Sequence, residues 1–480
     1  MKPPAEPNAP SRFKPVTPAI AEELRQIVGP RFVIFDQPEA LEPFSHDEVA
    51  EKEYHATPEA VVRPASAQEI AQIMKLANRQ RIPVTPRGGG SGLSGGAVPV
   101  HGGIVLSLDR MNRILEIDTQ NLVAVVEPGV ITNDIDAAVK EHGLFFAGYP
   151  MSLQSCFIGG NVAENAGGGK AVKYGVTGRY VLGLEVVTAE GQITQLGGKV
   201  VKNVSGYDLI GLFVGSEGTL GIFTKIILKL LPRPKRVVDL LVLFRDAASA
   251  IGLVPTIMTE ARIVPTAVEF MDRRSALAAC QYLNEKIPYE NAGAMLLIEL
   301  DGNSAGQLEQ DYEAVGELCL KGGALEVYVA DNATTSERIW SVRRSIAEAF
   351  MVESPHQSLE DICVPVAAIP RILPELDRLC EKYDIQIPCY GHAGDGNLHV
   401  TAVKNPRHTL AAWHDMLPGL LGELYEITRG LGGVISGEHG IGHKRKNYLH
   451  YSVDEVSLDL MRRLKQALDP NGVLNPGKIV

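Results

Sequence analysis

The sequence predicts an α+β protein with two or three domains, and three observations lead to that prediction. The chain has 480 residues, which is too long for a single hydrophobic core. In its second half, strand-like apolar runs alternate with helix-like segments, a pattern typical of α+β domains. The 48 glycines gather in a few clusters, so they indicate loops that build a site rather than low-complexity chain.

The composition is that of an ordinary soluble globular protein, with 45% hydrophobic and 21% charged residues. The net charge of −11 argues against nucleic acid or an anionic membrane surface as a partner. Residues Met1–Ala19 lack the apolar core of a secretory signal, and no run of ~18 apolar residues is present to span a bilayer. We therefore expect a cytoplasmic protein that reaches the inner membrane only through a partner.

The six cysteines are scattered and form no C-x-x-C pair, which indicates a reducing compartment. The same scatter excludes an iron–sulfur cluster held by this chain alone, since such clusters need closely spaced cysteines. A redox role would therefore require a separate acceptor for the electrons.

The first half is expected to fold as short strands and helices around glycine-rich loops. Residues 1–55 should hold a Pro-rich start, a short helix over Ala19–Val28 and irregular acidic chain. Ser66–Glu69 is a capping box that opens a helix running to about Arg79. Thr132 is expected to cap another helix, which stops at Gly143. Apolar runs predict strands at Ile82–Val84, Ile104–Leu108, Val123–Val126, Leu184–Thr188 and Ile222–Leu231.

The second half begins after Pro232 and Pro234, which break the chain at an expected domain boundary. Its predicted elements are strands at Met295–Leu300 and Leu325–Val329 and helices at Thr335–Met351, Ala367–Tyr383 and Val456–Leu468. The expected division is an N-terminal segment (1–55), a first domain (56–235), a second domain (236–430) and a C-terminal segment (431–480).

The most informative stretch is the glycine run Pro86–Gly96. It cannot be helix or strand, because glycine gives up too much backbone entropy in either, and its open N–H groups suit a phosphate. It contains the dinucleotide fingerprint G-x-G-x-x-G, but that fingerprint needs a helix directly after it. Ala97–Gly103 follows instead, with a proline and two glycines. A pyrophosphate on a helix is therefore excluded, while a phosphate-cradling loop and a flexible surface loop both remain open.

Two more glycine clusters follow. In Ile158–Lys170, Asn161 and Asn165 offer side-chain amides beside exposed backbone N–H groups, a combination that suits a flat ring with carbonyl and N–H edges. This cluster is not a P-loop, because Ala171 follows the lysine. A turn-rich connection is the alternative. Gly215–Ile222 again brings bare backbone into a loop before a strand.

The sharpest chemical signal lies in Tyr390–Val400. Asp395-Gly396 predicts a two-residue type I′ turn, which places His392 opposite His399 with Cβ atoms ~5 Å apart. Two imidazoles on one face can chelate a metal, and Glu438 supplies a third ligand with His439 beside it. Such a set suits Zn, Mn or Fe(II). A pair of hydrogen-bonded histidines in a hairpin is the alternative.

Other polar residues are less informative. Arg343 lies on a predicted helix, where arginine is either a bidentate clamp for a carboxylate or, more commonly, a solvated surface charge. No role is predicted for His101, His142, His356 or His443.

Together these stretches resemble the flavin-dependent oxidoreductases of the vanillyl-alcohol oxidase type. Within that group the chain is most similar to the glycolate oxidase flavoprotein subunit, D-lactate dehydrogenase and D-2-hydroxyglutarate dehydrogenase. The resemblance implies a two-subdomain FAD-binding unit of the PCMH type and a cap-like substrate domain. The matching motifs run in order from about residue 56 to the end: Arg87–Gly96, Ile158–Gly168, Gly215–Ile222, Gly391–His399, Ser436–Gly442 and Leu474–Lys478.

The resemblance also implies where FAD would bind. Its pyrophosphate would lie on the Gly88–Gly92 backbone. Ser91 stands where some relatives link the flavin through a histidine, so we expect non-covalent FAD. The expected cofactor-binding residues are Arg87, Gly88, Gly89, Gly90, Ser91, Gly92, Pro150, Ser152, Gly159, Gly160, Asn161, Asn165, Gly168, Glu217, Gly218 and Ile222.

The implied activity is FAD-dependent oxidation of a D-2-hydroxy acid to the 2-oxo acid, with hydride transfer to the flavin N5. In the 2-hydroxy-acid members, His392, His399 and Glu438 match metal ligands, His439 matches the catalytic base and Arg343 the residue that holds the substrate carboxylate. The metal would lower the pKa of the substrate hydroxyl. Electrons would pass to an iron–sulfur subunit, an electron-transfer flavoprotein or a quinone. The sequence leaves a homodimer open.

One departure concerns the substrate. Leu359 stands where the D-2-hydroxyglutarate enzymes carry a lysine near the distal carboxylate, so a second substrate carboxylate is less securely predicted. Two alternative functions are a flavin-dependent transferase of the alkylglycerone-phosphate synthase type and a flavin-binding scaffold subunit of a dehydrogenase complex.

Overall fold

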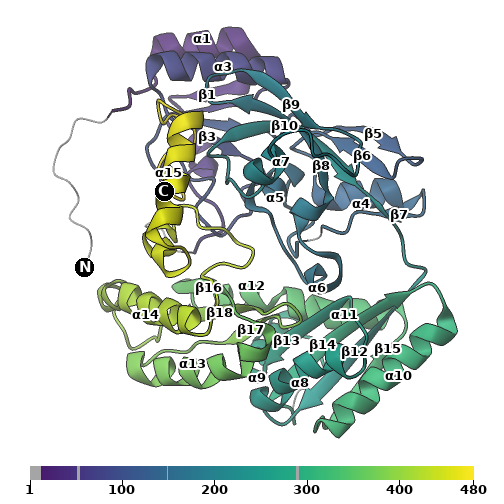
Figure 1. The fold of residues 1–480 in the computed structure, drawn as a ribbon. Helices are drawn as coiled ribbons and strands as arrows, with labels where there is room; N and C mark the ends of the chain where they lie inside the picture. The colour runs from purple at the N-terminus through teal and green to yellow at the C-terminus, as the bar shows by residue number, and fades with distance from the viewer. Residues whose placement is uncertain (1–11, 51–53, 149, 288–290) are drawn as a thin grey trace.

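The computed structural model describes residues 12–50, 54–148, 150–287 and 291–480, which form two lobes (Figure 1). The upper lobe is built from the N-terminal half and the lower lobe from the chain that follows, and α15 (Glu455–Leu468) returns to the upper lobe. The Pro-rich start expected at residues 1–11 and part of the acidic stretch, 51–53, lie outside the described residues. Among the described residues, no helix is both long and apolar enough to cross a membrane.

The upper lobe contains two main sheets. The four-stranded sheet has the order β1-β2-β4-β3, with β1 antiparallel and the others parallel, and the five-stranded antiparallel sheet has the order β5-β6-β10-β8-β9. A short pair, β7 (Leu144–Phe145) with β11 (Leu231–Pro232), lies apart from them. The strands of the main sheets are β1 (Val33–Phe35), β2 (Ala60–Val62), β3 (Val84–Arg87), β4 (Ile104–Ser107), β5 (Ile114–Asp118), β6 (Val123–Val126), β8 (Val181–Thr188), β9 (Ile193–Gly197) and β10 (Gly221–Lys229).

Helices α1 (Pro18–Val28) and α3 (Ala67–Gln80) cover the four-stranded sheet (Figure 1). The predicted capping box of α3 is confirmed, because Ser66 Oγ accepts a hydrogen bond from the Glu69 amide at 3.2 Å. The Glu69 carboxylate accepts from the Ala65 amide at 2.7 Å, so both side chains hold the first turn. Shorter helices of this lobe are α2 (Pro38–Leu41), α4 (Thr132–Lys140), α5 (Ile158–Glu164), α6 (Ala171–Tyr174) and α7 (Leu209–Phe213).

The lower lobe is one seven-stranded antiparallel sheet with helices on both faces. Its order is β15-β12-β14-β13-β17-β18-β16. Side chains of β12 alternate between two cores: Leu240 and Val242 face α8, α10, α13 and α14, whereas Leu241 and Leu243 face α9, α11 and α12. The strands are β12 (Arg236–Phe244), β13 (Ala267–Asp272), β14 (Ala294–Gly302), β15 (Glu326–Ala330), β16 (Gln357–Cys363), β17 (Cys389–His392) and β18 (Asn397–Val403).

The helices of this lobe are α8 (Ala247–Thr259), α9 (Arg273–Leu283), α10 (Ala305–Lys321), α11 (Ala333–Arg344), α12 (Ile346–Glu353), α13 (Ile369–Tyr383) and α14 (Leu410–Gly430). An antiparallel sheet covered by helices, next to a mixed two-sheet lobe, confirms the predicted α+β class.

Several predicted elements differ from the structure. Thr132 does not cap α4: Ile131 is the N-cap residue, the Thr132 hydroxyl accepts from Asn161 Nδ2 at 2.6 Å, and the helix ends at Lys140, before Gly143. The single helix predicted at Thr335–Met351 is two helices, because the backbone of Ser345 leaves the helical region with ψ near 3°.

Two glycine-rich segments also differ from prediction. The strand predicted at Ile82–Val84 lies at Val84–Arg87, so Pro86 and Arg87 belong to β3 and the loop starts at Gly88. The cluster at Ile158–Lys170 is not a loop throughout, since it begins with α5. As expected from Pro99, no helix follows the first glycine loop before β4.

Candidate active site

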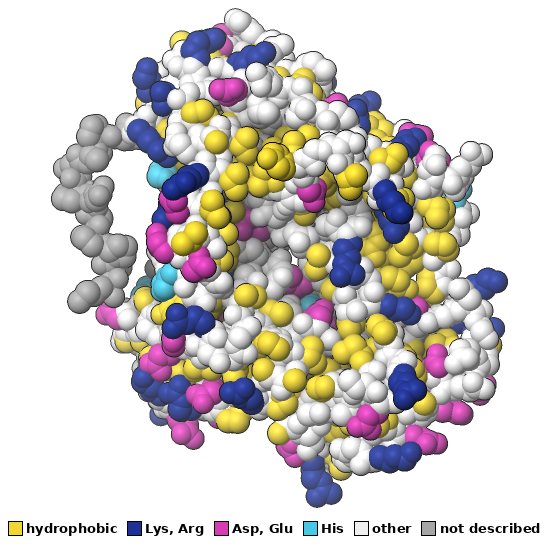
Figure 2. Space-filling view, viewed as in Figure 1, with side chains coloured by type: hydrophobic (Ala, Val, Ile, Leu, Met, Phe, Trp, Pro, Cys, Tyr) yellow, Lys and Arg dark blue, Asp and Glu magenta, His cyan; other side chains and the backbone are white. Residues whose placement is uncertain are grey.

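A cavity of about 550 Å³ lies between the two lobes, within the usual range of small-molecule sites. The surface is hollowed at this position in Figure 2. The glycine loop Gly88–Gly92 lines one side, and Arg343, Tyr390 and His399 from the lower lobe line the other.

The upper-lobe side of the cavity is mainly backbone. A Cβ atom on Gly89 would lie 2.5 Å from the Ser155 carbonyl oxygen, so only glycine fits there. Gly160 also lines the cavity, and a Cβ atom on it would project into open space, with nothing within 4 Å among the described residues. Gly90 has a φ of +73°, which a side chain rarely tolerates. Because these glycines have no side chains, their backbone N–H groups can face the cavity and space remains beside them. Both features fit a phosphate-containing cofactor such as FAD.

The cavity lining includes all of the predicted cofactor residues except Asn165 and Gly168. Of the two asparagines predicted to offer their amides to a flat ring, Asn161 lines the cavity and Asn165 does not. Asn165 has a φ of +54° at the end of α5, and its Oδ1 accepts from the Gly178 amide at 2.8 Å. Asn161 lines the cavity, but its Nδ2 donates to Thr132. Both side chains therefore hold the loop in shape.

Arg87 and Glu217 also use their charged ends within the protein. The Arg87 guanidinium donates to the carbonyl oxygens of His46 at 2.7 Å and Pro43 at 3.2 Å. The Glu217 carboxylate accepts from the amides of Ile441 and Gly442 at 2.8 and 2.6 Å. Burial raises the pKa of Glu217 to about 7, against the effect of these hydrogen bonds. Glu217 thereby ties the C-terminal segment to the upper lobe.

The predicted register of the histidine hairpin is wrong by two residues. His392 pairs with Asn397, and His399 pairs with Tyr390. A type I′ turn needs positive φ at both central residues, and of the pair Asp395-Gly396 only Gly396 has it, at +91°. Because side chains alternate with a period of two, the shift leaves both imidazoles on the same face, with ring centres 5.4 Å apart.

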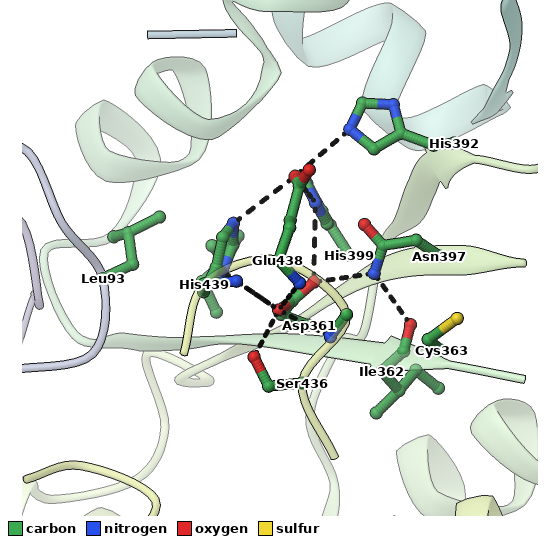
Figure 3. A network of polar contacts seen from close by, with 12 residues as sticks. Leu93, Asp361, Ile362, Cys363, His392, Asn397, His399, Ser436, Glu438 and His439 are labelled. Atoms are coloured by element: carbon green, nitrogen blue, oxygen red, sulfur yellow. Dashed lines mark hydrogen bonds and ion pairs between the residues drawn. The ribbon is translucent and has the colours of Figure 1, made fainter. Parts of the chain in front are cut away.

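The three predicted ligand residues lie together in the structure, and both histidines contact the Glu438 carboxylate (Figure 3). Glu438 Oε1 lies 3.2 Å from His392 Nε2 and 3.1 Å from His399 Nε2. His439 Nε2 is 3.9 Å from the same oxygen. His399, Glu438 and His439 line the cavity, whereas His392 is buried behind them. Converging imidazole and carboxylate donors of this kind fit a divalent ion.

The protonation states of these groups follow from their neighbours. Burial acts to lower the pKa of His392, but the carboxylates of Glu269 and Glu438 outweigh it and raise that pKa well above its usual value. Burial would raise the pKa of Glu438, but the two histidines lower it well below its usual value. For His439, burial dominates and lowers the pKa to about 4, so this imidazole is neutral near pH 7.

Asp361 is a site residue that sequence reasoning missed. Its Oδ2 accepts from the amides of Gly437, Glu438 and His439 at 3.0, 2.9 and 2.7 Å, and from Ser436 Oγ at 2.7 Å. Its Oδ1 accepts from Asn397 Nδ2 (Figure 3). Asp361 therefore fixes the loop that carries Glu438 and His439. Asp361 directly follows a second acid, Glu360, in β16, and its partner His399 on β18 could not be known without the strand pairing.

Arg343 is buried, at 3% exposure, so the reading as a solvated surface charge is wrong. Its Nε donates to Glu269 Oε2 at 2.7 Å, and its guanidinium carbon lies 5.1 Å from the centre of the Tyr390 ring. Its Nη2 is buried and has no hydrogen-bond partner in the part of the chain that the structure describes. Glu269 was also missed by sequence reasoning. His443, for which no role was predicted, contacts the Gly477 carbonyl oxygen at 3.4 Å and does not line the cavity.

Two family models match the chain: "FAD binding domain" over residues 58–197 and "FAD linked oxidases, C-terminal domain" over residues 233–479. The glycolate oxidase subunit GlcD of Bacillus subtilis is 41% identical over 465 residues, covering 97% of each chain. The D-lactate dehydrogenase of Anaerostipes hadrus is 38% identical, covering 98% of each. Among solved structures, 4-ethylphenol oxidase from Gulosibacter chungangensis has a TM-score of 0.77 at 20% identity, covering 96% of each chain, which shows a shared fold.

Proposed function

The chain belongs to the FAD-linked oxidase family, and from that premise we propose that it oxidises a D-2-hydroxy acid to the 2-oxo acid. One observation carries this proposal. His392 and His399 converge on Glu438, with His439 and the buried Arg343 close by, and all but His392 line the cavity whose other side is the glycine loop. This arrangement offers a carboxylate clamp, a proton acceptor and a set of metal ligands beside the cofactor cradle.

FAD would rest on the bare backbone of Gly88–Gly92, Gly159, Gly160 and Gly218, and it supplies two-electron acceptance when bound. Ser91 offers no imidazole for a covalent link, which supports a dissociable cofactor.

His392, His399 and Glu438 would hold a divalent Zn, Mn or Fe ion, whose chemistry there is that of a Lewis acid toward the substrate hydroxyl. Nε2 of each imidazole points toward the Glu438 carboxylate, so the three candidate ligand groups converge on one place. Asp361 is less suited as a ligand, because both of its oxygens already accept hydrogen bonds.

Arg343 would bind the substrate carboxylate through its unpartnered Nη2, since a buried guanidinium N–H is a strong donor to an anion. His439 would take the hydroxyl proton as general base. Its neutral form prevails near pH 7, and its buried Nδ1 has no hydrogen-bond partner within residues 12–50, 54–148, 150–287 and 291–480.

The electrons would then leave to a separate acceptor, which we propose to be an iron–sulfur subunit, an electron-transfer flavoprotein or a quinone. The six cysteines are free thiols in the structure. One similar protein is itself described as an oxidase subunit, which supports a partner protein.

An anaerobic screen tests the proposal. FAD-loaded protein with added Zn or Mn is mixed with glycolate, D-lactate, L-lactate and D-2-hydroxyglutarate, and the absorbance of oxidised flavin is followed. We expect bleaching by at least one of the D- or achiral acids. A flavin that none of them reduces would contradict the proposal, and would direct attention to a transferase without net redox change.

A further inference from the structure

We propose that Glu269 is a positioning residue that aims both the carboxylate-binding Arg343 and the ligand His392, an inference that rests on the proposed function. Glu269 Oε1 lies 2.7 Å from His392 Nδ1, and its Oε2 accepts from Arg343 Nε at 2.7 Å. All three side chains are buried, and Glu269 has no exposed surface. One carboxylate thus joins two groups that the reaction would use separately.

The fold places Glu269 at this position. It lies on β13 directly opposite His392 on β17, and cross-strand partners share one face of a sheet. Arg343 reaches the same carboxylate from α11, which packs on that face. The backbone of Gly169 from the upper lobe closes over the carboxylate, since a Cβ atom there would lie 2.8 Å from Oε1.

Each of the two contacts leaves the working end of its partner free. His392 uses Nδ1 on Glu269, so Nε2 points toward Glu438. A carboxylate on the second nitrogen of a ligating histidine fixes the tautomer and ring orientation. Arg343 uses Nε on Glu269, so Nη2 stays without a hydrogen-bond partner among the described residues. Glu269 therefore acts on metal affinity through one residue and on substrate affinity through the other.

Asp239 provides a matched control. This fully buried carboxylate lies on β12 of the same sheet and accepts from Trp340 Nε1 at 3.0 Å, one turn before Arg343 on the same helix. It also contacts Ser336. Asp239→Asn therefore weakens the attachment of α11 to the sheet, as Glu269→Gln would if Glu269 had only a structural role. It does so without changing a contact of His392 or Arg343.

The experiment compares wild type, Glu269→Gln, Glu269→Asp and Asp239→Asn as FAD-loaded proteins. Zn²⁺ affinity is measured by chelator competition without substrate, and KM and the limiting rate of anaerobic flavin reduction are measured with the best substrate. For Glu269→Gln we expect Zn²⁺ affinity to fall by about 10- to 100-fold and KM to rise about tenfold. FAD content should be unchanged. Glu269→Asp keeps the negative charge on a shorter side chain, so it should restore part of either the Zn²⁺ affinity or the KM.

Three results would overturn the inference. Zn²⁺ affinity and KM of Glu269→Gln could match those of Asp239→Asn, or only one of the two could change. If both Glu269 variants fail to fold while Asp239→Asn folds, the role of Glu269 is structural. A wild type that binds no Zn²⁺ and is reduced by no acid would instead remove the proposed function, and this inference with it.

Discussion

The two sides of the cavity are built on different principles. The upper-lobe side presents backbone, and its polar side chains, such as Arg87, Asn161 and Glu217, bind other parts of the protein. The lower-lobe side presents the side chains of His399, Glu438 and Arg343. Shape therefore governs the first side and buried charge the second. The difference teaches that the cradle should respond to added bulk, whereas the chemical side should respond to the loss of single polar atoms.

The largest effect should come from the chemical side. His439→Asn removes the proposed proton acceptor but keeps a polar side chain, so flavin reduction should slow by about 10²- to 10⁴-fold. Anaerobic stopped-flow absorbance measures the rate, and FAD content should be unchanged. The exposed His450→Asn serves as the control. A His439 variant that reduces its flavin at the wild-type rate would remove His439 from the reaction.

The next largest effect should come from Asp361, which holds the loop that carries Glu438 and His439. Asp361→Asn leaves an amide facing amide donors from Gly437, Glu438 and His439, and should lower the free energy of unfolding by about 2–3 kcal/mol. Flavin reduction should slow as well, because both Glu438 and His439 lose their anchor. Ser436→Ala removes only one donor from the same oxygen and should cost about 1 kcal/mol. Urea denaturation measures both, and equal losses in the two variants would contradict the anchoring role.

A smaller effect should come from the cradle. Gly160→Ala adds a methyl group in open space on α5, so FAD affinity should fall about tenfold. The apoprotein should become more stable by about 0.5–1 kcal/mol, because alanine favours a helix over glycine. Gly252 on α8 is likewise helical, with nothing within 4 Å of an added Cβ atom, and is exposed, so Gly252→Ala should give a similar gain in stability without the loss of affinity. Unchanged FAD binding by Gly160→Ala would show that the cofactor does not lie there.

The smallest expected effect is a pH dependence of the free energy of unfolding, caused by Glu217, which joins the C-terminal segment to the upper lobe. The folded-state pKa of Glu217, about 7, is raised above its usual 4.5, so its contribution to stability is present at low pH and is lost as pH rises toward 7. Glu217→Gln cannot ionise, so its free energy of unfolding relative to wild type should increase between about pH 5 and pH 8. Chemical denaturation across that range, with the exposed Glu141→Gln as a control, measures the difference. A constant difference would contradict the raised pKa.

The sequence predicted the cradle better than the chemical side, for a physical reason. A glycine cluster disfavours helix and strand through its own backbone entropy, so Gly88–Gly92 could be predicted to be a loop without knowing any partner. The hairpin was placed on the right face but in the wrong register, because a shift of two residues leaves every side chain on the same face. Asp361 and Glu269 were missed, since each shares its strand with a second acid, Glu360 or Asp272, and is distinguished only by its contact with His399 or His392 on the neighbouring strand.

The loop that carries Glu438 and His439 also sets an order in time. Ribosomes make the cradle, Arg343 and the histidine hairpin before this loop emerges, and the loop then docks on both lobes through Asp361 and Glu217. Glu438 and His439, the proposed third ligand and proton acceptor, are thus made together and after every other cavity residue except Lys444.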